Sequence, residues 1–348
     1  MTRSDTGKKP DLLYTVVIVG GGTAGLAVAA RLLRERPTLD IAIIEPSTTH
    51  AYQPGWTLVG AGAMTLKSTL KQERSLIPSQ ATWIREAVKS FEPDAHQVTL
   101  TGGRVIGYRR LIVCPGIQLD WNKIDGLSDT LGRNGVCSNY SRETVEYTWT
   151  CIQSLAGGQA IFTQPPMPIK CAGAPQKIAY LASDYWRKQG TLFRTKVDFS
   201  LAGEALFGVG YYLPELQNAV DYYGIDLNFK HNLVSVDGPG RKATFAVPAA
   251  NGKTEHVVKE FDMLHVTPPQ SAPDFVKSSP LANDAVWLAV DHGTLVNNKY
   301  DQVFGLGVAI GTSIANTMAA APSHTPVAGV KVLSSSDGAP NRVSADGY

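Results

Sequence analysis

Residues 14–46 read YTVVIVGGGTAGLAVAARLLRERPTLDIAIIEP, and this stretch decides the fold. The β-branched run 15–19 predicts a strand, the alanine-rich run 24–35 predicts a helix, and 41–44 predicts a second strand. Strand, helix and strand in this order form a βαβ unit, so we expect an α/β protein with a parallel sheet.

A glycine-rich loop joins the first strand to the helix. Gly20, Gly22 and Gly25 form the pattern GxGxxG, and Glu45 ends the second strand. Glycine is needed there because a β-carbon would block the tight turn and the close approach of a diphosphate to the helix N-terminus. Glu45 has the position of a carboxylate that accepts hydrogen bonds from a ribose. The pattern predicts a dinucleotide site, and the alternative is a glycine turn that only packs the helix on the sheet.

The same loop indicates which dinucleotide binds. Thr23 and Ala24 lie where backbone N–H groups face the phosphates, so we expect their amides to bind the cofactor. FAD is favoured over NAD because short strands and turns follow at 83–113, and a late strand ends in Gly305-Leu306-Gly307. Flavoproteins of this shape return to the flavin at such a strand end.

The rest of the chain predicts a second Rossmann-like domain and a return to the first. Expected helices lie at 144–155, 175–188 and 214–223, and expected strands at 160–163, 196–201, 262–267 and 302–307. We expect a first part of the FAD domain at 14–135, the second domain at 136–262, the return segment at 263–333 and a flexible tail at 334–348.

Composition excludes several classes of protein. Apolar residues make up 43% of the 348, and the formal charge is +2, so the chain is globular and nucleic acid is not an expected partner. The four cysteines match neither a zinc site nor a disulfide framework, and we expect no metal. No apolar run is long enough for a transmembrane helix. The first residues show no signal core and no clear transit peptide, which favours a cytoplasmic location.

Four stretches carry a family resemblance. Residues 50–62, HAYQPGWTLVGAG, resemble a signature of the sulfide:quinone oxidoreductases. Residues 138–141 (SNYS), 170–177 (KCAGAPQK) and 263–269 (MLHVTPP) are similar to the eukaryotic-type members. The resemblance extends from about residue 14 to the end of the sequence.

The resemblance implies a two-domain FAD enzyme of the pyridine nucleotide-disulfide oxidoreductase type, which oxidises sulfide and passes two electrons through the flavin to a quinone. By position, Glu45 would bind the adenosine ribose, Gln53 would touch the cofactor, and Val88 would meet the adenine through its backbone. The family also implies a mitochondrial location at the inner membrane, as a peripheral protein. Oligomeric state stays open.

The sulfur chemistry points to Cys171, which matches the family's first redox cysteine. It lies in a loop before the helix expected near Pro175, whose N-terminus would lower the thiol pKa. Cys114 and Cys151 are expected to be core residues. Cys137 lies near a position where some bacterial members carry an additional cysteine, and its role stays open.

The sequence also departs from the family pattern. The second redox cysteine lies beyond a DGY-like segment, and this sequence ends at Asp346-Gly347-Tyr348, so the chain resembles a C-terminally truncated or divergent member. Val308 replaces a carboxylate beside the flavin, and Asn316 replaces a lysine. These departures favour, as an alternative, a catalytically impaired flavin-binding relative. An NAD(P)H-dependent reductase is disfavoured because residues 164–168 read QPPMP where a glycine cradle is needed.

Overall fold

The computed structural model describes residues 9–311 and 320–337, and the chain divides into two compact units. Unit 1 comprises residues 1–51, 71–118 and 271–348, and unit 2 comprises 52–70 and 119–270. These divisions differ from the expected domain limits. The segment 52–70 belongs to unit 2, and the change from the first unit to the second falls near 118 rather than 135.

Unit 1 is built on a seven-stranded sheet whose parallel part has the order β5-β2-β1-β8-β19. The strands are β5 (Thr82–Ile84), β2 (Ile41–Ile44), β1 (Leu12–Val19), β8 (Val105–Val113) and β19 (Val303–Gly305). In the register, Val19 lies beside both Ile44 and Val113. This strand order is that of a dinucleotide-binding fold, so the expected α/β class is confirmed.

An antiparallel meander completes this sheet. β6 (Val88–Glu92) pairs with β7 (Gln97–Leu100), which pairs with the first half of β8. Within the stretch 83–113, where short strands and turns are expected, residues 85–87 separate β5 from β6, and the two strands pair at different places in the sheet. Glu86 lies between these two strands. Its carboxylate forms an ion pair, 2.8 Å from the guanidinium of Arg104 in the β7–β8 turn.

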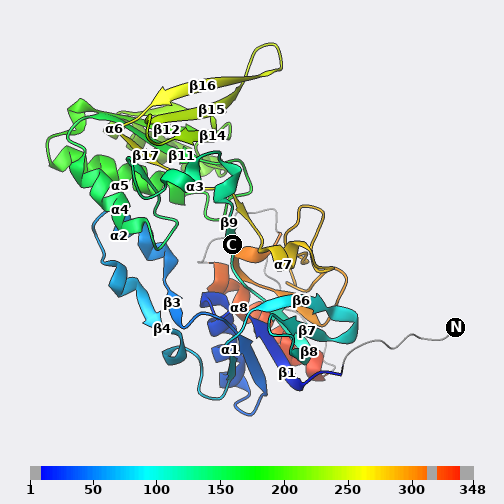
Figure 1. Cartoon of the computed structure of the whole chain (residues 1–348). Helices are drawn as coiled ribbons and strands as arrows, with labels where there is room; N and C mark the ends of the chain where they lie inside the picture. Colours follow the sequence, from blue (N-terminus) through cyan, green and yellow to red (C-terminus); the bar gives the residue numbers. More distant parts are fainter. Residues whose placement is uncertain (1–8, 312–319, 338–348) are drawn as a thin grey trace. The chain divides into compact units, whose positions relative to one another are not determined.

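Two helices pack together on unit 1 (Figure 1). α1 (Thr23–Glu35) buries Val28, Ala29 and Leu32 against the sheet, as its apolar spacing predicts. α8 (Ala320–Asp337) packs on α1 and adds Ala328 to the same core. Since α8 continues to Asp337, the expected tail at 334–348 begins inside a helix.

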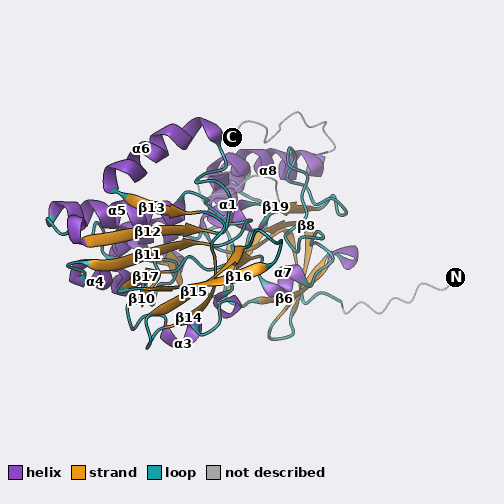
Figure 2. Cartoon of the chain, turned by 90° about the horizontal axis from the view of Figure 1, so that it is seen from above, coloured by secondary structure: helices purple, strands orange, loops and turns teal. Residues whose placement is uncertain are grey.

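Unit 2 contains a five-stranded parallel sheet of order β10-β17-β11-β12-β13, and Figure 2 shows these strands side by side. They are β10 (Val136–Cys137), β17 (Met263–His265), β11 (Gly158–Gln164), β12 (Thr195–Leu201) and β13 (Ile225–Asn228). One face packs on α4 (Val145–Ser154), α5 (Ala174–Lys188) and α6 (Leu213–Tyr223). The second α/β domain is therefore confirmed.

The other face of this sheet is covered by an antiparallel sheet that the sequence reading did not anticipate. Its strands are β14 (Asn232–Asp237), β15 (Lys242–Pro248) and β16 (Thr254–Glu260). Alternation along β11 explains the two faces: Phe162 packs toward the helices, whereas Ile161 packs with Phe245 of β15.

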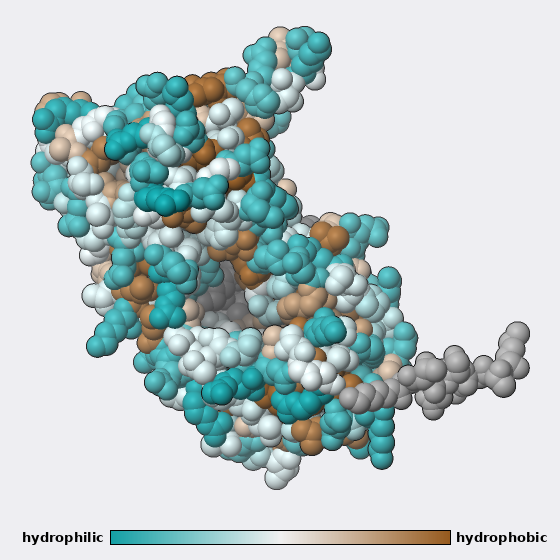
Figure 3. All heavy atoms as spheres, in the orientation of Figure 1, coloured by the Kyte–Doolittle hydropathy of each residue, from teal (hydrophilic) through white to brown (hydrophobic). Residues whose placement is uncertain are grey.

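The remaining elements are short. They are β3 (Thr49–Ala51), β4 (Leu70–Gln72), β9 (Gln118–Leu119), β18 (Gln270–Ser271), α2 (Trp56–Gly60), α3 (Leu127–Thr130) and α7 (Asp274–Lys277). In the part of the chain that the structure describes, no helix combines the length and apolarity needed to cross a bilayer. The face drawn in Figure 3 is mostly hydrophilic, with separate small hydrophobic patches.

Candidate functional site

The glycine loop between β1 and α1 is tightly packed at its first and last glycines. Gly20 has a φ of +107°, and a β-carbon there would overlap the carbonyl group of Cys114 at the end of β8. A β-carbon on Gly25 would overlap the carbonyl oxygen of Gly20. Both positions therefore require glycine for packing, whatever the loop binds.

The middle glycine is different. A β-carbon on Gly22 would meet no atom within 4 Å, and its φ of −69° is ordinary for any residue. Gly22 precedes α1, whose first turn contains no acidic residue and whose N-terminus has no side-chain cap. A helix N-terminus attracts anions, so this open side of the loop, which includes the backbone of Thr23 and Ala24, suits a diphosphate.

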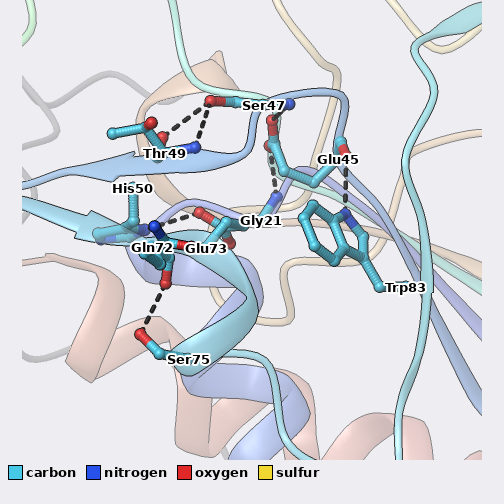
Figure 4. A network of polar contacts seen from close by, with 9 residues as sticks. All are labelled: Gly21, Glu45, Ser47, Thr49, His50, Gln72, Glu73, Ser75 and Trp83. Atoms are coloured by element: carbon cyan, nitrogen blue, oxygen red, sulfur yellow. Dashed lines mark hydrogen bonds and ion pairs between the residues drawn. The ribbon is translucent and has the colours of Figure 1, made fainter.

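Glu45 closes one side of the loop (Figure 4). Its carboxylate accepts from the Gly21 N–H at 2.8 Å and from the Ser47 N–H at 2.7 Å. Trp83 of β5 donates its indole N–H to the Glu45 carbonyl at 2.8 Å, which positions the end of β2. Each carboxylate oxygen keeps a lone pair free of these bonds, so Glu45 can still accept from a ribose hydroxyl.

Glu73 lies beside Glu45, and the sequence analysis did not identify it. Its side chain is only 2% exposed, and Oε2 lies 3.5 Å from His50 Nδ1. Its other oxygen, Oε1, has no hydrogen-bond partner and would lie 2.8 Å from a β-carbon on Gly21. Burial, and then the charge of Glu45, raise the pKa of Glu73 to about 7. No sequence signal marks this glutamate, because it sits in a polar run, KQERS, 28 residues beyond Glu45.

The late strand returns to this loop, as expected. Gly307 follows β19 with a φ of +72°, and a β-carbon on it would lie 3.3 Å from the β-carbon of Ala24. Val308 is half-buried in the 3-10 turn Gly307–Ala309. Asn316 falls outside the described residues. Val88 is buried in β6 and pairs with Leu100.

The loop residues fit a flavin dinucleotide. The open space at Gly22, the uncapped N-terminus of α1 and the carboxylate of Glu45 match a diphosphate followed by a ribose. The orphaned Oε1 of Glu73 adds a buried polar atom that lacks a protein partner. Within unit 1 the structure therefore brings together the loop residues that the sequence analysis selected, which are Gly20, Gly22, Thr23, Ala24, Gly25 and Glu45.

The stretch 50–62 combines surface and packing residues. Gln53 is exposed in the 3-10 turn Gln53–Gly55 of unit 2. Trp56 is buried and its indole N–H lies 3.2 Å from the Thr69 hydroxyl. Gly62 has a φ of +74° and packs on the Trp149 ring of α4, where a β-carbon would overlap the indole. Much of this motif thus holds α2 against α4.

Cys171 differs from the other cysteines. Cys114, Cys137 and Cys151 are buried, as expected for Cys114 and Cys151, whereas Cys171 is partly exposed in unit 2. Its φ of +61° is unusual for a residue with a side chain. Its carbonyl accepts from the Ala174 N–H at 2.8 Å, so the residue forms the turn into α5.

Segments 138–141 and 263–269 meet around this cysteine. Burial, and then the charge of Cys171, raise the pKa of the Tyr140 hydroxyl above its usual range, and Thr267 lies beside that hydroxyl. Burial lowers the pKa of Lys170 to about 8, and the Lys170 N–H donates to the Gln270 side chain at 2.7 Å. Tyr140 therefore lies close enough to Cys171 to interact with it, although the two are distant in sequence.

Comparison with known proteins agrees with this geometry. The family described as pyridine nucleotide-disulphide oxidoreductase matches residues 14–148. The chain is 42% identical over 314 residues to the mitochondrial sulfide:quinone oxidoreductase of Mus musculus, a match that covers 90% of the chain and 69% of that protein. It is 41% identical over 336 residues to the protein of the same name from Dictyostelium discoideum, with 96% and 73% covered.

Solved structures agree at the level of the fold. The crystal structure of the sulfide:quinone oxidoreductase from Aquifex aeolicus superposes with a TM-score of 0.80 at 20% identity, covering 94% of the chain and 78% of that structure. At this identity the likeness concerns the fold alone.

Proposed function

Because the chain belongs to the sulfide:quinone oxidoreductase family, we propose that it is an FAD-dependent oxidoreductase that oxidises sulfide and reduces a quinone. The observation that best supports flavin binding is the glycine loop of unit 1, which is open at Gly22 and flanked by Glu45. The choice of sulfide and a quinone as substrates rests on the family membership.

The loop residues hold the cofactor by its adenosine diphosphate part. The amides at the start of α1 bind the diphosphate, and Glu45 accepts from the ribose. By the family resemblance, the backbone of Val88 in the same unit meets a further part of the cofactor. When bound, FAD supplies an acceptor for two electrons and passes them on to the quinone.

Cys171 carries the sulfur. With bound FAD supplying the acceptor for two electrons, the Cys171 thiolate would form a bond to the sulfur of HS⁻ and give a persulfide, with one proton released. The quinone would take up these two electrons together with that proton and a second proton from solvent, and would become the quinol. Partial exposure admits sulfide to Cys171, in contrast to the three buried thiols. A later thiol acceptor removes the sulfur and restores Cys171.

The named relatives are mitochondrial proteins, and we place this chain in mitochondria as well. A quinone dissolved in a bilayer is reached from the surface, which is consistent with a peripheral position at the inner membrane.

The test is an anaerobic absorption spectrum of the FAD-loaded protein before and after sulfide, followed by addition of a short-chain ubiquinone. Bleaching of the flavin by sulfide and its return with quinone are the expected results. A flavin that stays oxidised with excess sulfide would contradict the proposal and favour a non-catalytic flavin-binding protein.

A further inference from the structure

A second carboxyl group is directed at the glycine loop. Glu73 begins the 3-10 turn Glu73–Ser75, and its N–H donates to the Thr48 carbonyl at 2.9 Å, while its carbonyl accepts from Leu76 at 2.9 Å. The backbone is therefore anchored on both sides. This anchoring directs the side chain toward Gly21, as Figure 4 shows.

The space between Glu73 and Gly21 leaves no room for a side chain. A β-carbon on Gly21 would lie 2.8 Å from Glu73 Oε1 and 2.7 Å from the Cγ of Glu45. The two carboxyl groups thus face the same glycine from two segments, 45 and 73.

The two carboxyl groups have different partners. Glu45 accepts hydrogen bonds from two backbone N–H groups, those of Gly21 and Ser47. Glu73 has only His50 at 3.5 Å beside Oε2, and Oε1 has no partner. Its pKa is raised to about 7 by burial and by the charge of Glu45. Neighbouring carboxyls in such unequal surroundings commonly take different protonation states.

The protonation state decides what Glu73 does to a phosphate. An ionised carboxylate only accepts hydrogen bonds and repels a diphosphate, whereas a neutral carboxylic acid carries one O–H donor. A buried oxygen without a protein partner needs one from elsewhere, since an unpaired buried polar group is costly. At the glycine loop, a phosphate oxygen would be an acceptor for the proton of a neutral Glu73.

We propose that Glu73 binds the adenosine diphosphate part of the cofactor as a neutral carboxylic acid, donating from Oε1 to a phosphate oxygen. The proposal rests on the flavin site proposed above. It makes cofactor binding dependent on pH, because the donor is lost and a repelling charge appears when Glu73 ionises. The titratable groups that face Glu73 are Glu45, after β2, and His50, in β3.

The experiment measures the Kd of the flavin-free protein for FAD from pH 6 to 8.5, by quenching of flavin fluorescence. ADP-ribose, which has no flavin, is measured in parallel by isothermal titration calorimetry, because it keeps the adenosine and the diphosphate and its phosphates do not change protonation in this range. For wild type, the Kd of both ligands should rise about tenfold or more between pH 6 and 8.5. In Glu73→Gln, whose amide donates at every pH, the Kd should stay near the wild-type pH 6 value throughout.

Two control variants identify the titrating group. Glu35→Gln lies at the far end of α1, about 20 Å along the helix from Gly22, and should keep the wild-type pH profile. His50→Gln should also keep the rise in Kd, because it leaves Glu73 ionisable. A rise that survives in Glu73→Gln but disappears in His50→Gln would overturn the proposal, and so would a flat wild-type profile. Failure of wild type to bind FAD at any pH would instead contradict the flavin site itself.

Discussion

The α-carbon of Gly25 in α1 packs directly on the carbonyl oxygen of Gly20, the first residue after β1. The contact brings the start of the helix against the end of the strand, with no room for a side chain. Gly22, between them, faces open space instead. Gly25 is therefore required for packing, whereas the open side of Gly22 is available for a ligand.

This difference predicts opposite results for two substitutions. Gly22→Val should abolish FAD binding while stability changes by less than about 1 kcal/mol, because the side chain enters only the space for the diphosphate. Gly25→Ala should destabilise the protein by roughly 1–3 kcal/mol or more, because its β-carbon overlaps backbone. Thermal unfolding of the flavin-free proteins and FAD titration separate the two effects. A Gly22→Val protein that still binds FAD would show that the cofactor lies elsewhere.

Cys171→Ser should stop bleaching of the flavin by sulfide without loss of bound FAD. Serine keeps the size and the strained backbone of this turn but cannot form a persulfide. Stopped-flow absorbance with excess sulfide is the measurement. Cys151→Ala, a change at a buried thiol in α4, is the control and should bleach like wild type. Unchanged bleaching in Cys171→Ser would mean that sulfide reacts at another group.

Val308→Asp should tighten FAD binding. Val308 follows Gly307, which lies against Ala24, and the resemblance places a carboxylate here that accepts a hydrogen bond from the flavin side chain. One such bond is worth about 1 kcal/mol, which corresponds to a roughly fivefold lower Kd. Fluorescence titration of Val308→Asp against Val308→Ala distinguishes the new acceptor from the loss of valine. An equal Kd for the two variants would argue against an acceptor role at this position.

His265 should make the protein less stable in acid. This residue is fully buried in β17, and Asn139 donates its N–H to Nε2 at 3.1 Å. Burial lowers the pKa of His265 from 6.5 to about 3, so the unfolded chain gains a proton that the folded protein does not. Stability is therefore lost as the pH falls from about 6.5 toward 3, by about 2 kcal/mol at pH 5.

His265→Gln keeps an acceptor for Asn139 but does not titrate, so it should lack this loss. Urea unfolding followed by tryptophan fluorescence at pH 7.5 and pH 5 measures the difference. The exposed His256→Gln serves as the control and should lose the same stability as wild type. An equal loss in His265→Gln would assign the acid sensitivity to other groups.

Local sequence determined the elements around the cofactor loop. The β-branched run of β1, the apolar spacing of α1 and the pattern of Gly20, Gly22 and Gly25 act over a few residues, so they can be read in order along the chain. The motifs at 50–62 and 170–177 likewise identified the family. Because Cys171 lies within the motif at 170–177, the sequence alone indicated it as the candidate redox cysteine.

Tertiary structure decided what depends on residues distant in sequence. The gap between β5 and β6 follows from their pairing with different strands, and the sheet of β14, β15 and β16 follows from the face of β11 that it covers. The packing of Gly62 on Trp149 shows that part of the family motif is structural. Glu73 is the clearest case, because an ordinary polar residue in sequence becomes a buried, unpaired carboxyl only when the chain folds back onto Gly21 and Glu45. Burial and neighbouring charge set its protonation, and neither is encoded in the residues next to it.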